Sequence, residues 1–439
     1  MTSSSEWRRL ERAHSKGARR AELAIEGGAA VRGEMLDPAK GAAYIGDEEK
    51  EAVLEVLGSR SLFRYYGPDL QRRVERFEQD LRDLIGVRHA IAVSSGTAAL
   101  RVALTAMDIG PGDEVVIPAV TFIATFAAVV AQRAVPVIAE VDRSLTLSPA
   151  DFEAKITPRT RAVIPVHLGN VPCRMDEIMA IARRRRLLVL EDAAQSFGAS
   201  YRGRRLGSIG DIGAFSLQFE KNITTGEGGA VTTDDFPLFD KAARYQDQGG
   251  QFTIQSGDVR EHTSGPPIIG ENLRMAEITG ALAAVQLRRL DGILAAMREN
   301  KRRVKGLLSD LPGLEFRETP DPQGDGGSAL TFFLDSPDLA VEFAEALRAE
   351  GIPAGQVYGG RPVYANPQIL ARRTAWERGC PFNCAEHPTD VRYFMGMCPR
   401  SEDLLRRSVA IGIGPRYEER DCHDIVRAVR KVARGLLSP

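Results

Sequence analysis

Three segments of this 439-residue chain carry side chains suited to covalent or proton-transfer chemistry. Lys221 lies between apolar residues and a glycine-rich stretch, and a lysine amine removed from water loses its proton more easily and forms Schiff bases with aldehydes. Asp192 follows the apolar run Leu187–Leu190, where a buried acid needs a cation or a proton. Ser94–Leu100 (SSGTAAL) follows the apolar run His89–Val93, and a helix that starts there offers free amides to a phosphate.

Taken singly, each segment also has a structural interpretation. Ser, Gly and Thr in Ser94–Leu100 are ordinary helix-capping residues, Asp192 is a suitable cap for the segment after it, and a lysine before glycines usually lies on the surface. Taken together, a phosphate cradle, an acid and a Schiff-base lysine in this order are what pyridoxal 5′-phosphate needs. The acid stabilises the protonated pyridine nitrogen, and the ring then acts as an electron sink. The three segments therefore predict a site for this cofactor.

The elements that must position these residues follow from a regular pattern that begins at Gly41. Strands alternating with helices at this spacing indicate an α/β fold with a mainly parallel sheet covered on both faces. Ligands of such sheets bind outside the carboxyl ends of the strands, where all three segments lie. The predicted strands are His89–Val93, Val115–Ile117, Val135–Ile138, Ala162–Val166, Leu187–Leu190, Ala214–Leu217 and Ala230–Thr232, and the helices between them include Thr97–Ala106, Ile123–Gln132 and Met175–Arg184.

The alternation of short apolar runs and amphipathic stretches ends at about residue 265, which predicts a second domain. Met275–Lys305 is rich in Leu, Ala and Arg, and we expect a long helix there that connects the two domains. The predicted large domain covers residues 41–295, and a smaller C-terminal α/β domain covers residues 296–439. Residues 1–40 contain no apolar core of a signal peptide, and we expect them to form a flexible N-terminal extension.

The composition argues against several classes of function. The chain has 58 Lys+Arg and 59 Asp+Glu, a formal net charge of −1, whereas a broad nucleic-acid surface needs a clustered basic excess. The uncharged stretch Val115–Ala131 is predicted to be a buried strand, a turn and a buried helix, because Pro118 and two threonines interrupt it. Five scattered cysteines are too few for a disulfide framework. We therefore expect a cytoplasmic protein with no nucleic-acid or membrane partner.

Four residues near the C-terminus have the chemistry of metal ligands. Cys380, Cys384 and His387, with Cys398 further on, would suffice for a structural zinc, but their spacing is irregular. We predict no metal and interpret the cysteines as separate thiols. Whether the four residues have a joint role stays open at this point.

Five longer segments, spread over roughly residues 85–290, resemble one known family. They are SSGTAAL, GDEVVIPAVTFIAT, EDAAQSFGASYRGRRLGSIGDIGAFS, KNITTGEGGAVTTDD and NLRMAEITGALAAVQL. On these motifs the chain is similar to the DegT/DnrJ/StrS sugar and cyclitol aminotransferases, a branch of the fold type I pyridoxal-phosphate enzymes. The resemblance implies a large pyridoxal-phosphate-binding domain, a smaller C-terminal domain and a homodimer with shared active sites.

The resemblance also implies a role for each matching residue. Lys221 would bond to the cofactor aldehyde and then move a proton between the substrate carbon and the cofactor carbon, while Asp192 would pair with the pyridinium nitrogen. Gln195 would lie near the phenolic oxygen, and Phe122 would stack on the ring. The residues implied for the phosphate are Gly96, Thr97 and Ser216 of one subunit and Asn272, which would reach the phosphate of the neighbouring subunit.

Lys221 also bears on the type of reaction, because the sugar-dehydrating members of the family have histidine at this position. The resemblance then implies an aminotransferase that moves an amino group from glutamate or glutamine to a keto-sugar or keto-cyclitol by a ping-pong mechanism, in antibiotic or glycan biosynthesis. One alternative is a pyridoxal-phosphate dehydratase or aromatising lyase on a related cyclic substrate, because some members with the lysine catalyse elimination. A second is a non-catalytic regulator, which Lys221 and Asp192 disfavour.

Four further residues are candidates for substrate contacts. Tyr358, Arg361 and Tyr364 lie in a Gly/Pro-rich stretch, and our hypothesis is that they contact an acidic donor or a sugar phosphate. His167 follows the predicted strand Ala162–Val166, and it either lines the substrate pocket or is a hydrogen-bonded structural histidine. The sequence identifies neither the acceptor nor which of the two donors is used.

Overall fold

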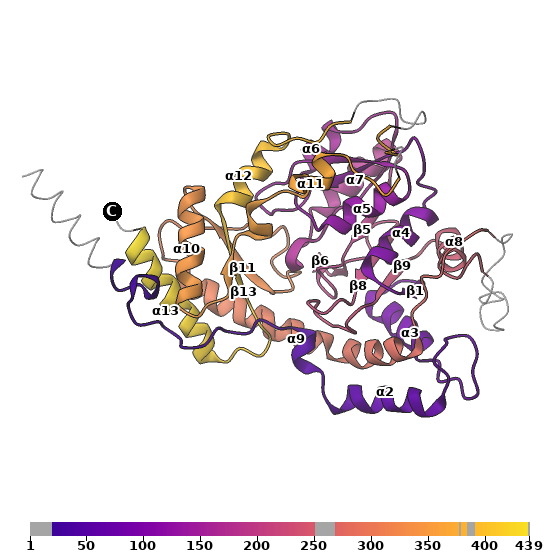
Figure 1. Cartoon of the computed structure of the whole chain (residues 1–439), viewed down its shortest axis with the longest axis horizontal. Helices are drawn as coiled ribbons and strands as arrows, with labels where there is room; N and C mark the ends of the chain where they lie inside the picture. The colour runs from indigo at the N-terminus through magenta and orange to yellow at the C-terminus, as the bar shows by residue number, and fades with distance from the viewer. Residues whose placement is uncertain (1–19, 251–267, 377–378, 384–390, 438–439) are drawn as a thin grey trace, which may run out of the picture.

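The computed structural model describes residues 20–250, 268–376, 379–383 and 391–437 (Figure 1). Seven strands form the larger sheet in the order β1-β9-β8-β5-β4-β2-β3. Only β9 runs against its neighbours, so six of the seven strands point the same way, and the predicted mainly parallel sheet is confirmed. The strands are β1 (His89–Val93), β2 (Glu114–Pro118), β3 (Val135–Ala139), β4 (Thr160–Val163), β5 (Leu188–Asp192), β8 (Ile212–Ser216) and β9 (Gly229–Thr233).

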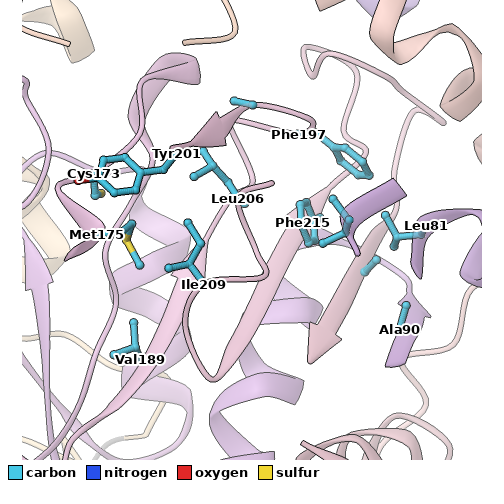
Figure 2. Close-up of a cluster of buried hydrophobic side chains, with 14 of the residues drawn as sticks. Leu81, Ala90, Cys173, Met175, Val189, Phe197, Tyr201, Leu206, Ile209 and Phe215 are labelled. Atoms are coloured by element: carbon cyan, nitrogen blue, oxygen red, sulfur yellow. The ribbon is translucent and has the colours of Figure 1, made fainter. Parts of the chain in front are cut away.

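Successive residues of a strand point to opposite faces of this sheet, and each face has its own hydrophobic core. Figure 2 shows one core, in which Val189 and Phe215 point to the same side. Leu190 and Ala214, their neighbours in sequence, belong to the core of the other face. The first core is completed by α3 (Arg73–Ile85) and α7 (Met175–Arg185), and the second by α4 (Gly96–Ala106), α5 (Ile123–Ala131) and α8 (Phe236–Gln246).

A long helix, α9 (Glu277–Leu308), runs from the larger sheet to a second, smaller sheet (Figure 1), as the sequence predicted. It packs against α2 (Asp47–Ser59) and α3 at one end and against α13 (Glu419–Leu436) at the other. The smaller sheet is antiparallel, in the order β10-β11-β13-β12. Its strands are β10 (Glu315–Phe316), β11 (Ala329–Phe333), β12 (Ala354–Gly355) and β13 (Ser408–Gly412), and α10 (Pro337–Ala349) packs against it and against α12 (Pro399–Arg407). In contrast, α11 (Pro367–Leu370) contributes Ile369 to the second core of the larger sheet.

Residues 20–40 differ from the flexible extension that the sequence suggested. Leu23 and Leu36 are 1% and 6% exposed and belong to the hydrophobic core of the smaller sheet. The buried carboxylate of Glu350 accepts two backbone N–H bonds from this segment, each 2.9 Å long. The segment is ordered because it completes a core formed mostly by residues some 300 positions later, which local composition does not reveal. Residues 1–19 lie outside the described residues.

Two further sequence predictions meet different outcomes. Val115–Ala131 forms β2, a turn and α5, as predicted, and no described helix is both long and apolar enough to cross a membrane. The interpretation of Cys380 as a separate thiol was wrong, because it is disulfide-bonded. Cysteine counts say nothing of which side chains the chain brings together. Cys384 and His387 lie outside the described residues, and within the described ranges no three His, Cys, Asp or Glu side chains are grouped to hold a metal ion.

Candidate active site

One cavity of about 640 Å³ lies at the carboxyl ends of the strands of the larger sheet. Because β1, β2, β5 and β8 point the same way, the segments that follow them meet at one edge of the sheet. The cavity is lined by seven of the eight predicted site residues: Gly96, Thr97, Phe122, Asp192, Gln195, Ser216 and Lys221.

Asp192 is the last residue of β5, and its carboxylate is almost fully buried. Oδ2 accepts a hydrogen bond of 2.8 Å from the Thr125 hydroxyl, and Oδ1 accepts one of 3.1 Å from the backbone N–H of Ala194. Burial raises the pKa of Asp192, and these two hydrogen bonds with the positive charge of Lys221 offset that shift only in part. Among the described residues, Asp192 is therefore a buried acid without an ion-pair partner, and a protonated ring nitrogen would supply one.

Lys221 lies in the loop between β8 and β9, and its side chain is half-buried in the cavity wall. The next residue, Asn222, is buried and donates to Oδ1 of Asn170 (2.7 Å) and to the carbonyl of Phe197 (2.8 Å), which fixes the backbone that carries the lysine. Burial lowers the pKa of Lys221, and the negative charge of Asp192 raises it in part. A larger fraction of the amine is therefore neutral and nucleophilic than for a lysine in water.

The turn after β1 has the geometry of an anion cradle. Ser95 caps α4, since its hydroxyl accepts a hydrogen bond of 3.1 Å from the backbone N–H of Ala98. The backbone amides of Gly96 and Thr97 lie in the first turn of α4, where they have no acceptor within the helix. A Cβ atom on Gly96 would lie 2.7 Å from Cβ of Ser216, so only glycine lets the turn approach the end of β8 this closely.

Phe122 and Gln195 line the same cavity as this cradle. Phe122 is 58% exposed although it lines the cavity, and it makes no ring contact with any other described aromatic side chain. A planar ligand would cover that exposed face. On Gln195, Nε2 donates to the hydroxyl of Tyr358 (2.7 Å), and Oε1 accepts a long bond of 3.4 Å from the backbone N–H of Gly169. The amide plane of Gln195 is thereby held at the cavity wall.

These features fit pyridoxal 5′-phosphate. The cradle at Gly96, which a Cβ atom would fill, matches the phosphate. The exposed ring of Phe122 matches the cofactor ring, and the buried acid Asp192 matches the ring nitrogen. A desolvated lysine in the same cavity matches the cofactor aldehyde.

Some predicted contacts lie elsewhere. Asn272 is exposed and does not line the cavity of its own chain, so its role toward a neighbouring subunit stays a prediction. His167 is fully buried outside the cavity, with Nε2 3.0 Å from Glu191, and this identifies it as the hydrogen-bonded structural histidine. Tyr364 was wrongly suggested as a substrate contact, because it is fully buried and its hydroxyl donates to Glu402 (2.5 Å). Arg361 lines a smaller adjoining cavity of about 220 Å³.

Three residues at the site were missed. Thr125 lies one helical turn after Phe122, and only the fold brings it to Asp192. Lys40 lies next to Lys221 in the fold, because the backbone N–H of Gly41 donates to the Lys221 carbonyl (3.4 Å). Burial and the charge of Lys221 lower the pKa of Lys40. Arg317 lines the cavity from the segment after β10. Thr125 ends the segment GDEVVIPAVTFIAT, but nothing in that segment relates it to Asp192, and Lys40 and Arg317 lie outside the five segments.

Comparisons with known proteins give a consistent result. A model of the DegT/DnrJ/EryC1/StrS aminotransferase family matches residues 43–430. The L-glutamine:2-deoxy-scyllo-inosose aminotransferase of Streptoalloteichus tenebrarius is 33% identical over 436 residues, which cover 94% of this chain and 97% of that protein. The UDP-N-acetyl-3-dehydro-alpha-D-glucosamine 3-aminotransferase of Acidithiobacillus ferrooxidans is 35% identical over 406 residues, 91% and 98% of the two chains. The crystal structure of S. venezuelae DesV in complex with a ketimine intermediate superposes with a TM-score of 0.74 at 32% identity, covering 88% of this chain and 94% of that one.

Proposed function

This chain belongs to the DegT/DnrJ/EryC1/StrS aminotransferase family, and we propose that it uses pyridoxal 5′-phosphate to move an amino group from glutamate or glutamine to a keto-sugar or keto-cyclitol. The observation that supports the proposal most directly is that Lys221, Asp192 and the first turn of α4 line one cavity. Two relatives are named as a glutamine-dependent cyclitol aminotransferase and a nucleotide-sugar aminotransferase, and both support this class of acceptor.

The bound cofactor would supply an aldehyde carbon and an electron-withdrawing ring. The phosphate would be held by the backbone amides of Gly96 and Thr97, at the start of α4, and by the hydroxyl of Ser216, at the end of β8. All three residues line the cavity. Asp192, oriented by the hydroxyl of Thr125, would keep a proton on the ring nitrogen. Phe122 would cover one face of the ring and exclude water from it.

Lys221 would be both the point of covalent attachment and the general base. Burial lowers the pKa of its amine, so Nζ is able to take the proton from Cα of the amino-acid donor and to deliver it to the neighbouring carbon. Glu220 and Glu227 also line the cavity, and their charges raise the pKa of Lys221 in part. The balance between burial and these acids would keep the amine near the protonation state that proton transfer requires.

The test is a visible spectrum of the purified protein, reconstituted with pyridoxal 5′-phosphate, before and after glutamate or glutamine is added. We expect the cofactor band to disappear with one of these donors, with one equivalent of 2-oxo acid released, and to return when a keto-sugar or keto-cyclitol is added. Keto product formed without consumption of a donor would instead support the dehydratase or lyase alternative. Failure to bind the cofactor would contradict the proposal and favour a non-catalytic regulator.

A homodimer and a cytoplasmic location are part of the same proposal. In the dimer, Asn272 of one subunit would reach the phosphate of the other, which agrees with its exposed position outside its own cavity. Antibiotic or glycan biosynthesis is the proposed setting. The relatives above act on a cyclitol and on a nucleotide-linked sugar, so their names do not distinguish the two settings.

A further inference from the structure

Arg317 is a buried cation in the wall of the active-site cavity that the reaction described above does not use. It follows β10 in the chain and is 8% exposed, yet it lines the same cavity as Lys221 and Asp192. Its backbone N–H donates to the carbonyl of Thr331 in β11 (2.9 Å), so the smaller sheet fixes the position of the side chain.

The guanidinium group of Arg317 has hydrogen bonds but no anionic partner among the residues that the structure describes. Nε donates to the carbonyl of Ser144 (2.6 Å) and Nη2 to that of Leu168 (2.9 Å). Among the described ranges, no carboxylate lies within 4.0 Å of it, and Nη1 makes no hydrogen bond to a protein atom. Burial lowers its pKa to about 10, and the negative charges of Asp325 and Asp142 offset this only in part. Arg317 therefore stays protonated at neutral pH.

A buried charge without a partner destabilises the folded protein unless an anion binds to it. Two carbonyl groups orient the guanidinium plane in advance, while Nη1 and the second N–H of Nη2 stay available for a ligand. Such a fixed edge matches the two oxygens of a carboxylate.

The position of this edge relates it to Gln195 through Gly169. A Cβ atom on Gly169 would lie 3.7 Å from Nη1 of Arg317, and the backbone N–H of Gly169 donates to Oε1 of Gln195. Gln195 is the residue proposed to lie against the cofactor ring near its phenolic oxygen. Only Gly169 thus separates the free edge of Arg317 from Gln195, which is proposed to lie against the ring.

We propose that Arg317 binds the α-carboxylate of the amino-acid donor and thereby selects amino acids over other amines. The inference rests on the proposed function. Glutamate and glutamine both carry a carboxylate on the carbon that reacts, whereas the ring of a keto-sugar or keto-cyclitol carries no charge beside its carbonyl. A cation beside the ring therefore fits the donor rather than the acceptor.

The experiment measures the two half-reactions separately for the wild type and for the variants Arg317→Gln and Arg317→Lys. Donor binding is followed through the loss of cofactor absorbance with glutamine and with 4-aminobutanamide, which is glutamine without its α-carboxylate. For Arg317→Gln we expect the KM for glutamine to rise about 10- to 100-fold and the preference for glutamine over 4-aminobutanamide to disappear. Arg317→Lys keeps the charge but loses the planar edge, so its KM should rise less. The acceptor half-reaction should be unchanged in both.

Arg298→Gln is the matched control. Arg298 and Arg317 both line a second cavity of about 960 Å³, but Arg298 does not line the active-site cavity. Its substitution should leave donor kinetics unchanged, and cofactor absorbance and the thermal midpoint show that each variant is folded and loaded.

The possible results separate this inference from the proposed function. If Arg317→Gln weakens glutamine and 4-aminobutanamide equally, or if only the KM for the acceptor rises, the assignment of Arg317 is wrong while aminotransfer stands. Unchanged donor kinetics would have the same meaning. A wild type that binds the cofactor and accepts an amino group from no amino acid would overturn both. If Arg317→Gln does not fold, the test is the preference of Arg317→Lys for glutamine over 4-aminobutanamide. A reduced preference supports the assignment, and an unchanged preference contradicts it.

Discussion

Glu191 and Asp192 are neighbouring buried carboxylates at the end of β5, and their surroundings are opposite in kind. Glu191 accepts three backbone N–H bonds from the loop 207–210 and lies 3.0 Å from Nε2 of His167. Asp192 accepts one hydroxyl bond from Thr125 and one backbone N–H bond. Burial alone would raise the pKa of both groups. The contacts of Glu191 reverse that shift and lower its pKa, whereas the pKa of Asp192 stays raised.

The alternation of side chains along β5 explains this difference. Glu191 points to the same face as Val189, where the loop 207–210 packs over the core in Figure 2. Asp192 points to the same face as Leu190, toward the cavity. On one face the chain supplies every partner that a carboxylate needs, and on the other it leaves the carboxylate short of partners. We therefore assign stability to Glu191 and chemistry to Asp192.

The largest effect should come from removing the amine on the cavity side. Lys221→Ala should abolish turnover and the visible band of the bound cofactor, because the amine proposed to bond to the cofactor aldehyde is removed. The unfolding free energy without cofactor should not fall, since a desolvated charge is removed. Activity assays, absorbance spectra and urea unfolding check these points. Lys241→Ala, which removes an exposed ion pair with Asp108, is the control and should remain active.

Asp192→Asn should lower kcat by about 10²- to 10³-fold, because the ring nitrogen would lose the charge that stabilises its protonated form. The same change should not lower the unfolding free energy of the cofactor-free protein. The Asn oxygen would accept from the backbone N–H of Ala194, its NH2 group would donate to the Thr125 hydroxyl, and the desolvated carboxylate is removed. Steady-state kinetics and urea unfolding measure the two quantities. A variant that unfolds readily but, while folded, turns over at the wild-type rate would contradict the assignment.

Glu191→Gln should show the reverse pattern. The amide group of glutamine would face backbone N–H donors of the loop 207–210, so we expect the unfolding free energy to fall by about 2–4 kcal/mol. At low temperature the folded fraction should still bind the cofactor and show its visible band. Urea unfolding with parallel absorbance spectra provides the measurement. Loss of the cofactor band with unchanged stability would show that Glu191 belongs to the chemistry after all.

The smallest effect is a pH dependence that separates the two faces. The pKa of Asp192 is raised above its ordinary value of 3.8, so between that value and its folded pKa the folded state binds more protons than the unfolded state. The stability contributed by this group therefore falls as pH rises through that window. Asp192→Asn has no titrating group here and lacks this loss. The unfolding free energy of the variant relative to that of the wild type should therefore grow with pH, by at most about 1.4 kcal/mol per pH unit within the window. Urea unfolding of cofactor-free protein from about pH 4 upward tests the trend. A difference that shrinks as pH rises would contradict it.

Much of this architecture is already present in local sequence patterns. Short apolar runs predict β1, β2, β5 and β8, and the structure has strands at each of these places. Once the strands are parallel, the residues that follow them must meet at one edge, which is why seven predicted site residues line the same cavity. Asn272 is the exception, since its predicted role depends on a second copy of the chain.

The sequence is sufficient for the type of fold and for seven residues that line the cavity, because both follow from periodicity and from short motifs at strand ends. The tertiary structure was needed for the partners of those residues. Thr125 beside Asp192, Tyr358 bonded to Gln195 and Arg317 in the cavity wall are separated in sequence from the groups they serve by tens to more than a hundred positions. The first contact depends on how α5 packs on the larger sheet and the other two on how the two sheets pack, and no local pattern of hydrophobicity encodes that packing.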